Sequence, residues 1–213
     1  MLHGRLSRGI GEHRRPDLAQ SSSILRKAPQ AKALFHTGRM TQQPVAAPES
    51  ILLLIRHGIA EDPRPGRPDA ERGLTEEGWK KTRAAMRGLV KAGWIPDAAF
   101  ASPYRRAAET LSCLTGAALK RGLEAFPAGT WEGCVPEGDP VKAEAWLLKR
   151  MAAAKPGATL AIISHQPFLG ELIYQLTGDN IEIKKASCTV VARKDGTWSL
   201  KGHFAPSDLR TMD

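Results

Sequence analysis

A chain of 213 residues with 42% hydrophobic residues is long enough for one domain of ordinary size with a buried core. No apolar run approaches the roughly 18 residues that span a membrane, which argues against a membrane-spanning helix. The formal net charge of +9 would favour a nucleic-acid or membrane partner if it were spread over the fold. It is instead concentrated in residues 1–39, which hold eight Arg or Lys and two acids, so we expect neither partner.

Residues 1–48 lack apolar periodicity and are rich in Arg, Ser, Gln, Ala and Pro, which predicts a tail ahead of the folded domain. Three interpretations stay open: a disordered tail, a stretch upstream of a natural start at Met40, and an Arg-rich amphipathic targeting peptide. The three cysteines form no metal-ligand spacing and fit a reducing compartment. We therefore expect a cytoplasmic protein, or an organellar one if residues 1–39 are a targeting peptide.

From Ile51 onward, short apolar runs alternate with helical patterns, which predicts an α/β domain. The expected elements, in chain order, are a buried parallel strand at 51–55, a helix from 75 to about 93, a strand at 98–101, a helix capped by Ser102 and running to about 116, an irregular segment at 117–139, a helix from 140 to about 154, a strand at 159–164, a helix opened by Pro167 and ended by Gly178, and a closing hairpin of strands at 188–192 and 197–204.

Polar residues follow three of these strands at the point where each strand ends. They are Arg56-His57-Gly58, Ser102-Pro103-Tyr104-Arg105-Arg106 and Ser164-His165-Gln166-Pro167. Parallel strands joined by crossover helices end at one edge of the sheet, so two histidines and at least two arginines are expected to share one crevice. The two later strand ends also lead into helix N-termini, whose free N–H groups favour an anion.

Such a set of side chains suits phosphoryl transfer. Guanidinium groups bind phosphate oxygens bidentately and stay charged, and a neutral imidazole, with an unperturbed pKa of about 6.5, is a nucleophile near pH 7. Its attack would give a phosphohistidine that water then hydrolyses. Gly58 would let the backbone pass close to the bound group. No metal or other cofactor is required, because two arginines and a second imidazole supply the positive field.

The three motifs resemble those of the histidine phosphatase superfamily, also called the phosphoglycerate mutase-like fold, and in particular its SixA-type phosphohistidine phosphatases. The resemblance covers about residues 50–204 and implies one histidine phosphatase domain over 49–213. The implied fold is a single three-layer α/β/α domain with a mostly parallel central sheet.

The resemblance also implies a role for each matching residue. His57 is the expected nucleophile, and Arg56, Arg106 and His165 are expected to bind the phosphoryl oxygens, with Gly58 beside them. The spacing of the second motif selects Arg106 rather than its neighbour as the phosphate-binding arginine.

The general acid is not identified by the resemblance. Glu137 and Glu124 are the candidates, and Glu109 stands where the family usually has glutamine. Phosphate esters need proton donation to their leaving group, whereas a phosphoimidazole leaves easily once its ring is protonated. A weakly defined acid therefore favours phosphohistidine as the substrate. The segment 69–75 also resembles the stretch that precedes the first helix in the SixA-type phosphatases, and Arg72 within it stands either at the pocket rim or on the surface.

The sequence therefore predicts a metal-independent phosphatase that works through a phosphohistidine intermediate and dephosphorylates protein phosphohistidine. The alternative is a small-molecule phosphomonoesterase of the same superfamily. We expect a phosphorylated protein or a small phosphorylated molecule as partner, and a monomeric enzyme. Two other classes remain, a metallohydrolase with His57 and His165 as ligands and a non-catalytic binding module. No metal-ligand spacing supports the first, and the intact His57 and Arg106 argue against the second.

Overall fold

The structure, a computed structural model, describes residues 48–213, and most of the predicted tail over 1–48 lies outside them. The described residues fold around a six-stranded sheet in the order β3-β2-β4-β1-β5-β6. The strands are β1 (Ser50–Arg56), β2 (Ala98–Ala101), β3 (Ala128–Thr130), β4 (Thr159–Ser164), β5 (Cys188–Lys194) and β6 (Thr197–Phe204). Strands β1 to β4 pair in parallel, whereas β5 pairs antiparallel with both β1 and β6. The predicted mostly parallel sheet is confirmed.

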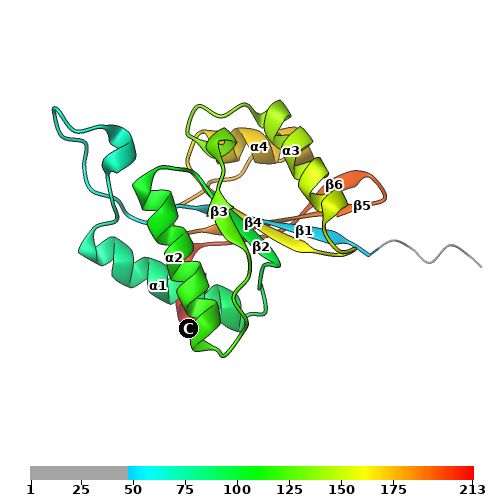
Figure 1. Cartoon of the computed structure of the whole chain (residues 1–213), viewed down its shortest axis with the longest axis horizontal. Helices are drawn as coiled ribbons and strands as arrows, with labels where there is room; N and C mark the ends of the chain where they lie inside the picture. The colour runs from blue at the N-terminus through cyan, green and yellow to red at the C-terminus, as the bar shows by residue number, and fades with distance from the viewer. Residues whose placement is uncertain (1–47) are drawn as a thin grey trace, which may run out of the picture. The chain divides into compact units, whose positions relative to one another are not determined.

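Helices cover both faces of the sheet. They are α1 (Glu76–Lys91), α2 (Arg105–Lys120), α3 (Pro140–Ala153), α4 (Phe168–Thr177) and α5 (Pro206–Thr211), with short 3-10 turns η1 (Asp69–Glu71) and η2 (Glu132–Cys134). In Figure 1, α1 and α2 lie on one side of the sheet and α3 and α4 on the other. No helix within residues 48–213 has the length and apolarity needed to cross a membrane.

The two cores follow from the alternation of side chains along β1. Leu53 and Ile55 are fully buried in a core that includes residues of α1, α2 and α5. Leu52 and Leu54 point to the other face and are fully buried with residues of α3 and α4. A strand that is apolar at every position therefore needs a helical layer on each side, which is the three-layer arrangement observed.

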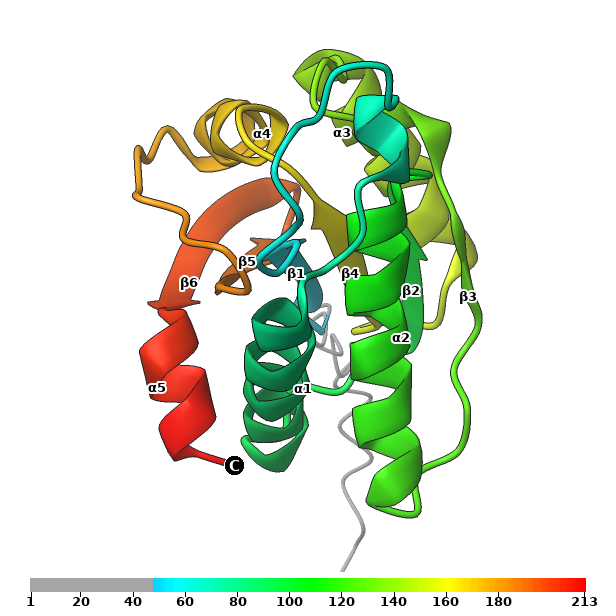
Figure 2. The same cartoon turned by 90° about the vertical axis from the view of Figure 1, so that its left-hand side faces the viewer.

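The parallel register brings the carboxyl ends of three strands to one edge. Arg56 at the end of β1 is paired with Ser164 at the end of β4, and Ala101 at the end of β2 is paired with Ile163. Figure 2 looks toward this edge, with the segment between β1 and α1 and the start of α2 on the near side. The residues that follow β1, β2 and β4 therefore start from neighbouring positions, as the sequence predicted.

Several element boundaries differ from the prediction. Helix α2 begins at Arg105 after an N-cap at Tyr104, and Ser102 does not cap it; its Oγ instead accepts a hydrogen bond from the backbone N–H of Tyr104 at 3.3 Å. The helix also continues to Lys120, because Ala117 and Ala118 are buried in its packed face. The segment predicted to be irregular contains the three-residue β3, which is specified mainly by its pairing with β2.

The remaining elements agree more closely. The side chain of Thr75 accepts a hydrogen bond from the backbone N–H of Gly78, so it is the N-cap of α1. Gly178 ends α4 in the left-handed conformation, with φ 77°, which a glycine adopts at no steric cost. Helix α5 was not predicted, because its six residues are too few to show a helical period.

Candidate active site

Three side chains from the three strand ends meet at the carboxyl edge of the sheet. His57, Arg106 and His165 are 7%, 4% and 1% exposed. Nε of Arg106 donates a hydrogen bond to Nε2 of His57 over 3.3 Å. The rings of His57 and His165 have their centroids 4.9 Å apart. Residues far apart in the sequence are thus gathered around one small site, as predicted from the parallel sheet.

The hydrogen bonds of His57 define its tautomer. Nδ1 lies 2.7 Å from the carbonyl oxygen of Gly58. A carbonyl oxygen can only accept, so Nδ1 carries the proton. Nε2 is then the nitrogen with the free lone pair, and it faces the guanidinium of Arg106. Backbone geometry at the end of β1 therefore presents an unprotonated nitrogen to the centre of the site.

Both histidines of the site are held neutral. Burial, together with the positive charges of Arg106, Arg56 and Lys185, lowers the pKa of His57 to about 3, against the opposing hydrogen bond with Gly58. Burial, with the positive charge of Arg106 nearby, lowers the pKa of His165 to about 2. Neutral imidazoles remain available as nucleophile and hydrogen-bonding group well below pH 7.

His165 is buried without a hydrogen-bond partner for either ring nitrogen among the described residues. Most buried polar groups in proteins are hydrogen-bonded, and an unpaired one usually has a functional reason. The ring of Tyr104 lies against it, with centroids 5.0 Å apart. The guanidinium carbon of Arg106 lies 4.9 Å from the centroid of the same Tyr104 ring. Tyr104 thus packs against both the Arg106 guanidinium and the His165 ring, a contact that the motif alone did not reveal.

Arg106 is held by a carboxylate that sequence reasoning did not assign to the site. Its Nη1 donates to the backbone oxygen of Asp69 over 2.8 Å, and its Nη2 donates to Oδ2 of Asp69 over 2.8 Å. Burial alone would raise the pKa of Asp69, but hydrogen bonds from Arg72 and Arg106 outweigh it and lower that pKa. The sequence offered only the resemblance of segment 69–75 to the SixA-type phosphatases, which did not predict the contact between Asp69 and Arg106.

Arg72 lies at the rim, behind Asp69. Its Nε donates to Oδ1 of Asp69 over 2.7 Å, and its Nη1 donates to the backbone oxygen of Glu61. Arg72 therefore fixes Asp69 rather than pointing a free guanidinium at His57. The loop between β1 and α1 is tied to the site through this chain of ionic contacts.

Arg56 and Gly58 flank His57, the first with a guanidinium side chain and the second with a backbone that packs closely against neighbouring residues. Nη1 of Arg56 donates to the backbone oxygen of Ile183 over 2.7 Å, while its buried Nε has no partner among the described residues. The N–H of Gly58 donates to Oγ1 of Thr110 over 3.1 Å. A Cβ on Gly58 would lie 2.0 Å from Oγ1 of Thr82, so close packing against α1 requires a glycine here.

The candidate general acids are placed differently. Glu137 is exposed, and its charge is one cause, after burial, of the raised pKa of Tyr104, so it lies near the rim of the site. Glu124 is exposed and follows the end of α2 that is opposite to Arg106, so the structure does not bring it to His57. Glu109 forms an ion pair with Arg105 over 2.7 Å and does not contact Arg106. Within residues 48–213, no three His, Cys, Asp or Glu side chains gather to hold a metal ion.

Comparison with known proteins gives a consistent result. The histidine phosphatase superfamily (branch 1) matches residues 52–147. An uncharacterised protein of Picosynechococcus sp. (strain ATCC 27264 / PCC 7002 / PR-6) is 31% identical over 156 residues, 71% of this chain and 89% of that protein. The solved structure of the protein histidine phosphatase SixA complexed with tungstate has a TM-score of 0.65 at 23% identity, over 75% of this chain and 99% of that one.

A phosphoserine phosphatase of Entamoeba histolytica, solved as a mutant with phosphoserine, has a TM-score of 0.58 at 16% identity, over 75% of this chain and 99% of that one. The chain therefore belongs to the histidine phosphatase superfamily. Its fold is that of phosphoglycerate mutase-like proteins. Membership supports hydrolysis of a phosphoryl group as its activity.

Proposed function

We propose that this protein is a metal-independent phosphatase in which His57 is phosphorylated, and that its substrate is phosphohistidine in proteins. The observation that carries the proposal is the buried pair of neutral histidines around Arg106, with Nε2 of His57 unprotonated. A positively charged, desolvated site with a neutral nitrogen nucleophile is suited to a phosphoryl group.

The reaction proceeds in two steps. Nε2 of His57 attacks phosphorus and forms a P–N bond, while the bond from phosphorus to the leaving group breaks and the leaving group keeps its electron pair. Arg106, Arg56 and His165 donate hydrogen bonds to the phosphoryl oxygens, His165 through its single ring N–H. Water then attacks phosphorus, and the P–N bond to Nε2 breaks as the P–O bond forms. The imidazole of His57 keeps the electron pair and is neutral again, and inorganic phosphate leaves with the protons of the water, one of which passes to solvent.

The protonation states around His57 favour phosphohistidine over a phosphate ester. Hydrogen bonds from Arg72 and Arg106 lower the pKa of Asp69, which keeps this carboxylate ionised at neutral pH. His165 is neutral, because burial lowers its pKa to about 2. Neither group can supply a proton to an alkoxide in the free enzyme. A phosphohistidine substrate needs no such donor, because its own imidazole is protonated near neutral pH and leaves readily.

A small phosphate ester is the second candidate. It is favoured by the likeness of the fold to the phosphoserine phosphatase of Entamoeba histolytica. Glu137 at the rim would then be the residue to examine as proton donor. Relative rates on the two substrate classes separate the candidates.

The test is an acid-quench experiment on the full chain. We expect a peptide carrying ³²P-phosphohistidine to label the protein transiently on His57, with hydrolysis faster than that of phosphoserine or a sugar phosphate. His57→Ala should lower kcat by at least about a thousandfold. His203→Ala is the matched control, because His203 lies on β6 and bonds Thr189, and it should keep full activity.

Three kinds of result would contradict this proposal. Label on a residue other than His57, or turnover retained in His57→Ala, would mean that the nucleophile is different. Phosphate esters hydrolysed far faster than phosphohistidine would mean that the substrate is a small molecule. Loss of activity in excess chelator would indicate metal chemistry instead.

A further inference from the structure

A second basic pocket opens beside the active site. Its volume is about 480 Å³, and the charged residues that line it are all cations: Arg56, Lys81, Lys184, Lys185 and Arg210. Ile59 also lines the pocket. Arg56 and Ile59 stand immediately before and after His57-Gly58 in the chain. The remaining lining residues come from α1, α5 and the segment before β5, which Figure 2 shows next to one another on the near side.

The two lysines before β5 are tied to the backbone of the active site. The N–H of Ala186 donates to the carbonyl oxygens of Arg56 and His57, each over 3.1 Å. Ala186 has φ 63°, a left-handed conformation that is unfavourable for a residue with a Cβ. Backbone strain of this kind persists only where the surrounding structure imposes it, and it is frequent at functional sites. The strained turn fixes the chain that carries Lys184 and Lys185 beside His57.

The positive charge of Lys185 affects the pKa of His57 in the candidate active site. It is one of the causes that lower the pKa of His57, after burial and the charges of Arg106 and Arg56. The pocket and the candidate nucleophile therefore share one electrostatic field. The pocket also adjoins the candidate nucleophile in the chain, because Arg56, which lines it, directly precedes His57.

The cations of the pocket are only partly balanced by acids. Lys81 pairs with Glu77 and Lys184 pairs with Glu182, the latter over 3.5 Å, and both carboxylates are exposed. These pairs offset two of the five positive charges that line the pocket, so its lining stays positively charged. Within residues 48–213, Lys185 makes no ion pair with a carboxylate.

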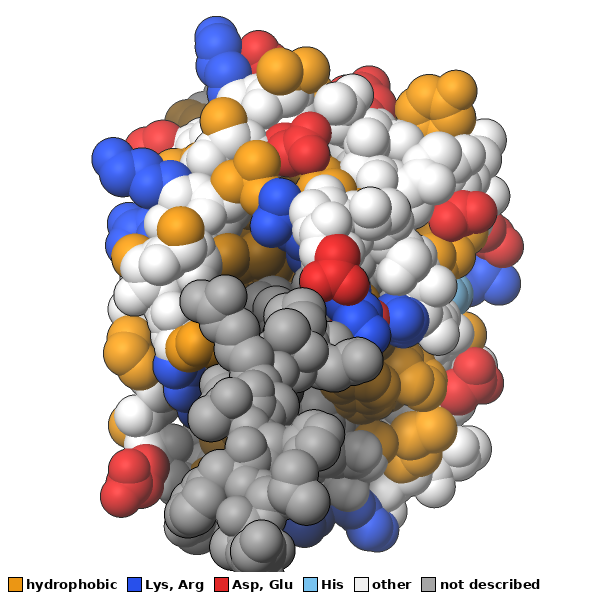
Figure 3. Space-filling model, turned by 90° about the vertical axis from the view of Figure 1, so that its right-hand side faces the viewer, with side chains coloured by type: hydrophobic (Ala, Val, Ile, Leu, Met, Phe, Trp, Pro, Cys, Tyr) orange, Lys and Arg blue, Asp and Glu red, His pale blue; other side chains and the backbone are white. Residues whose placement is uncertain are grey.

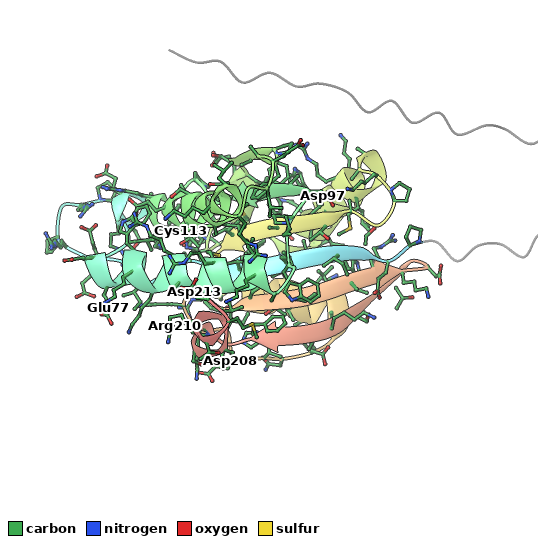
Figure 4. All side chains as sticks on the ribbon, turned by 90° about the horizontal axis from the view of Figure 1, so that it is seen from below. Glu77, Asp97, Cys113, Asp208, Arg210 and Asp213 are labelled. Atoms are coloured by element: carbon green, nitrogen blue, oxygen red, sulfur yellow. The ribbon has the colours of Figure 1, made fainter. Side chains whose placement is uncertain are left out.

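Arg210 likewise makes no ion pair with a carboxylate among the described residues. Figure 4 shows Arg210 and Asp208 on α5, on the side of the molecule where Glu77 stands near the start of α1. Asp208 does not line the pocket. The opposite edge of the sheet contrasts with this arrangement, because acidic and basic side chains are interspersed over the part of that surface not drawn in grey (Figure 3).

We propose that this basic pocket binds acidic side chains of the protein that carries the phosphohistidine. The inference rests on the proposed function and names a feature of its substrate, a cluster of Asp or Glu next to the phosphorylated histidine. Exposed lysines are flexible point charges, which suit several carboxylates in a variable arrangement, whereas a single fixed phosphate is typically held by bidentate arginines. The open volume of the pocket also exceeds what one phosphate group needs.

We expect the basic pocket to contribute to the association of the enzyme with its acidic substrate. Complementary charges raise the rate of encounter and fix the orientation of a partner, and salt weakens them. We therefore expect a lower KM for an acidic substrate at low ionic strength, with a smaller effect on kcat. The advantage should shrink as salt is added.

The experiment compares two phosphohistidine peptides with the full-length protein. One peptide has four Asp or Glu residues around the phosphohistidine, and the other has Ser and Gln in their place. The readout is the ratio of the two kcat/KM values at low salt, which we expect to be about tenfold in favour of the acidic peptide. Lys184→Glu/Lys185→Glu should bring the ratio to one or below, and Lys184→Ala/Lys185→Ala should lower it in part.

Lys120→Glu is the matched control, because Lys120 is exposed and lies at the end of α2 that is opposite to Arg106. It should keep the preference for the acidic peptide. Circular dichroism confirms that the charge-reversed double variant is folded. A ratio near one in the unchanged protein, or a ratio that survives both double variants, overturns the inference while leaving the phosphatase proposal intact.

Two further outcomes have separate meanings. If neither phosphohistidine peptide is hydrolysed but a phosphate ester is, the proposed function itself fails. If a bisphosphorylated small molecule is preferred over its monophosphate, and the lysine variants remove that preference without affecting peptides, the pocket serves a second phosphate and the inference is wrong.

Discussion

Arg106 is buried, and all three nitrogens of its guanidinium group donate hydrogen bonds to protein atoms. Its Nε faces His57, and its two terminal nitrogens are taken by the backbone and side chain of Asp69. A phosphoryl group that binds to Arg106 must displace the carboxylate of Asp69 from the guanidinium group. Asp69 is therefore a built-in competitor for the proposed phosphate-binding arginine.

Replacing Asp69→Asn tests this competition. The amide keeps an oxygen that can accept from Arg106 but loses the negative charge, so inorganic phosphate should inhibit about two- to fivefold more strongly, as expected for a partly exposed ion pair. Initial rates measured at increasing concentrations of inorganic phosphate give the inhibition constant of phosphate. Glu71→Gln is the control, because Glu71 stands in the same short turn and the ion pair of Arg106 is with Asp69 instead. Weaker inhibition in Asp69→Asn would show that the carboxylate supports phosphate binding.

Two glycines within helices differ in the space around them, one in a tight helix contact and the other with open space beside it. A Cβ on Gly88 in α1 would lie 1.7 Å from the backbone oxygen of Leu209 in α5. A Cβ on Gly116 in α2 would meet nothing within 4 Å. Gly88 thus permits α1 and α5 to touch, and α5 carries Arg210 to the basic pocket.

Gly88→Ala should lower the free energy of unfolding by about 1–3 kcal/mol, because the added methyl group forces α1 and α5 apart. Gly116→Ala should raise it by about 0.5–1 kcal/mol through the helix propensity of alanine. Urea denaturation of both variants measures the two changes. Equal stabilisation of both would mean that α5 does not pack tightly on α1.

For the whole molecule, the neutral histidines make stability depend on pH. Burial lowers the pKa of His57 to about 3 and that of His165 to about 2, whereas both groups titrate near 6.5 in an unfolded chain. Between these values the unfolded state binds protons that the folded state does not. The free energy of unfolding is therefore greatest above about pH 6.5 and falls as the pH drops toward 3.

We expect a loss of up to about 1.4 kcal/mol per pH unit for each of these histidines between pH 6 and pH 5. Urea unfolding at pH 7, 6 and 5 measures the slope. His57→Gln and His165→Gln should each make it shallower. An unchanged free energy of unfolding from pH 7 to pH 5 would show that the two imidazoles are charged in the folded protein.

The amino-acid sequence by itself determined five of the six strands, most of the helices and the set of side chains at the carboxyl edge. The apolar run of β1 can only be buried between two helical layers, and parallel pairing brings His57 and His165 to the same edge wherever the loops go. Local patterns also placed Thr75 at the start of α1 and Gly178 at the end of α4. These features depend on neighbours in the chain or on the regular geometry of a sheet.

Only the tertiary structure decided the contacts made by the loops. Asp69 meets Arg106, and Lys185 stands beside His57, because of the paths that two irregular segments take across the edge of the sheet. No period in the sequence describes such paths, since they are set by side-chain contacts and backbone hydrogen bonds between distant residues. The position of Glu124 away from His57 has the same origin, because the length of α2 carries it to the other end of the domain.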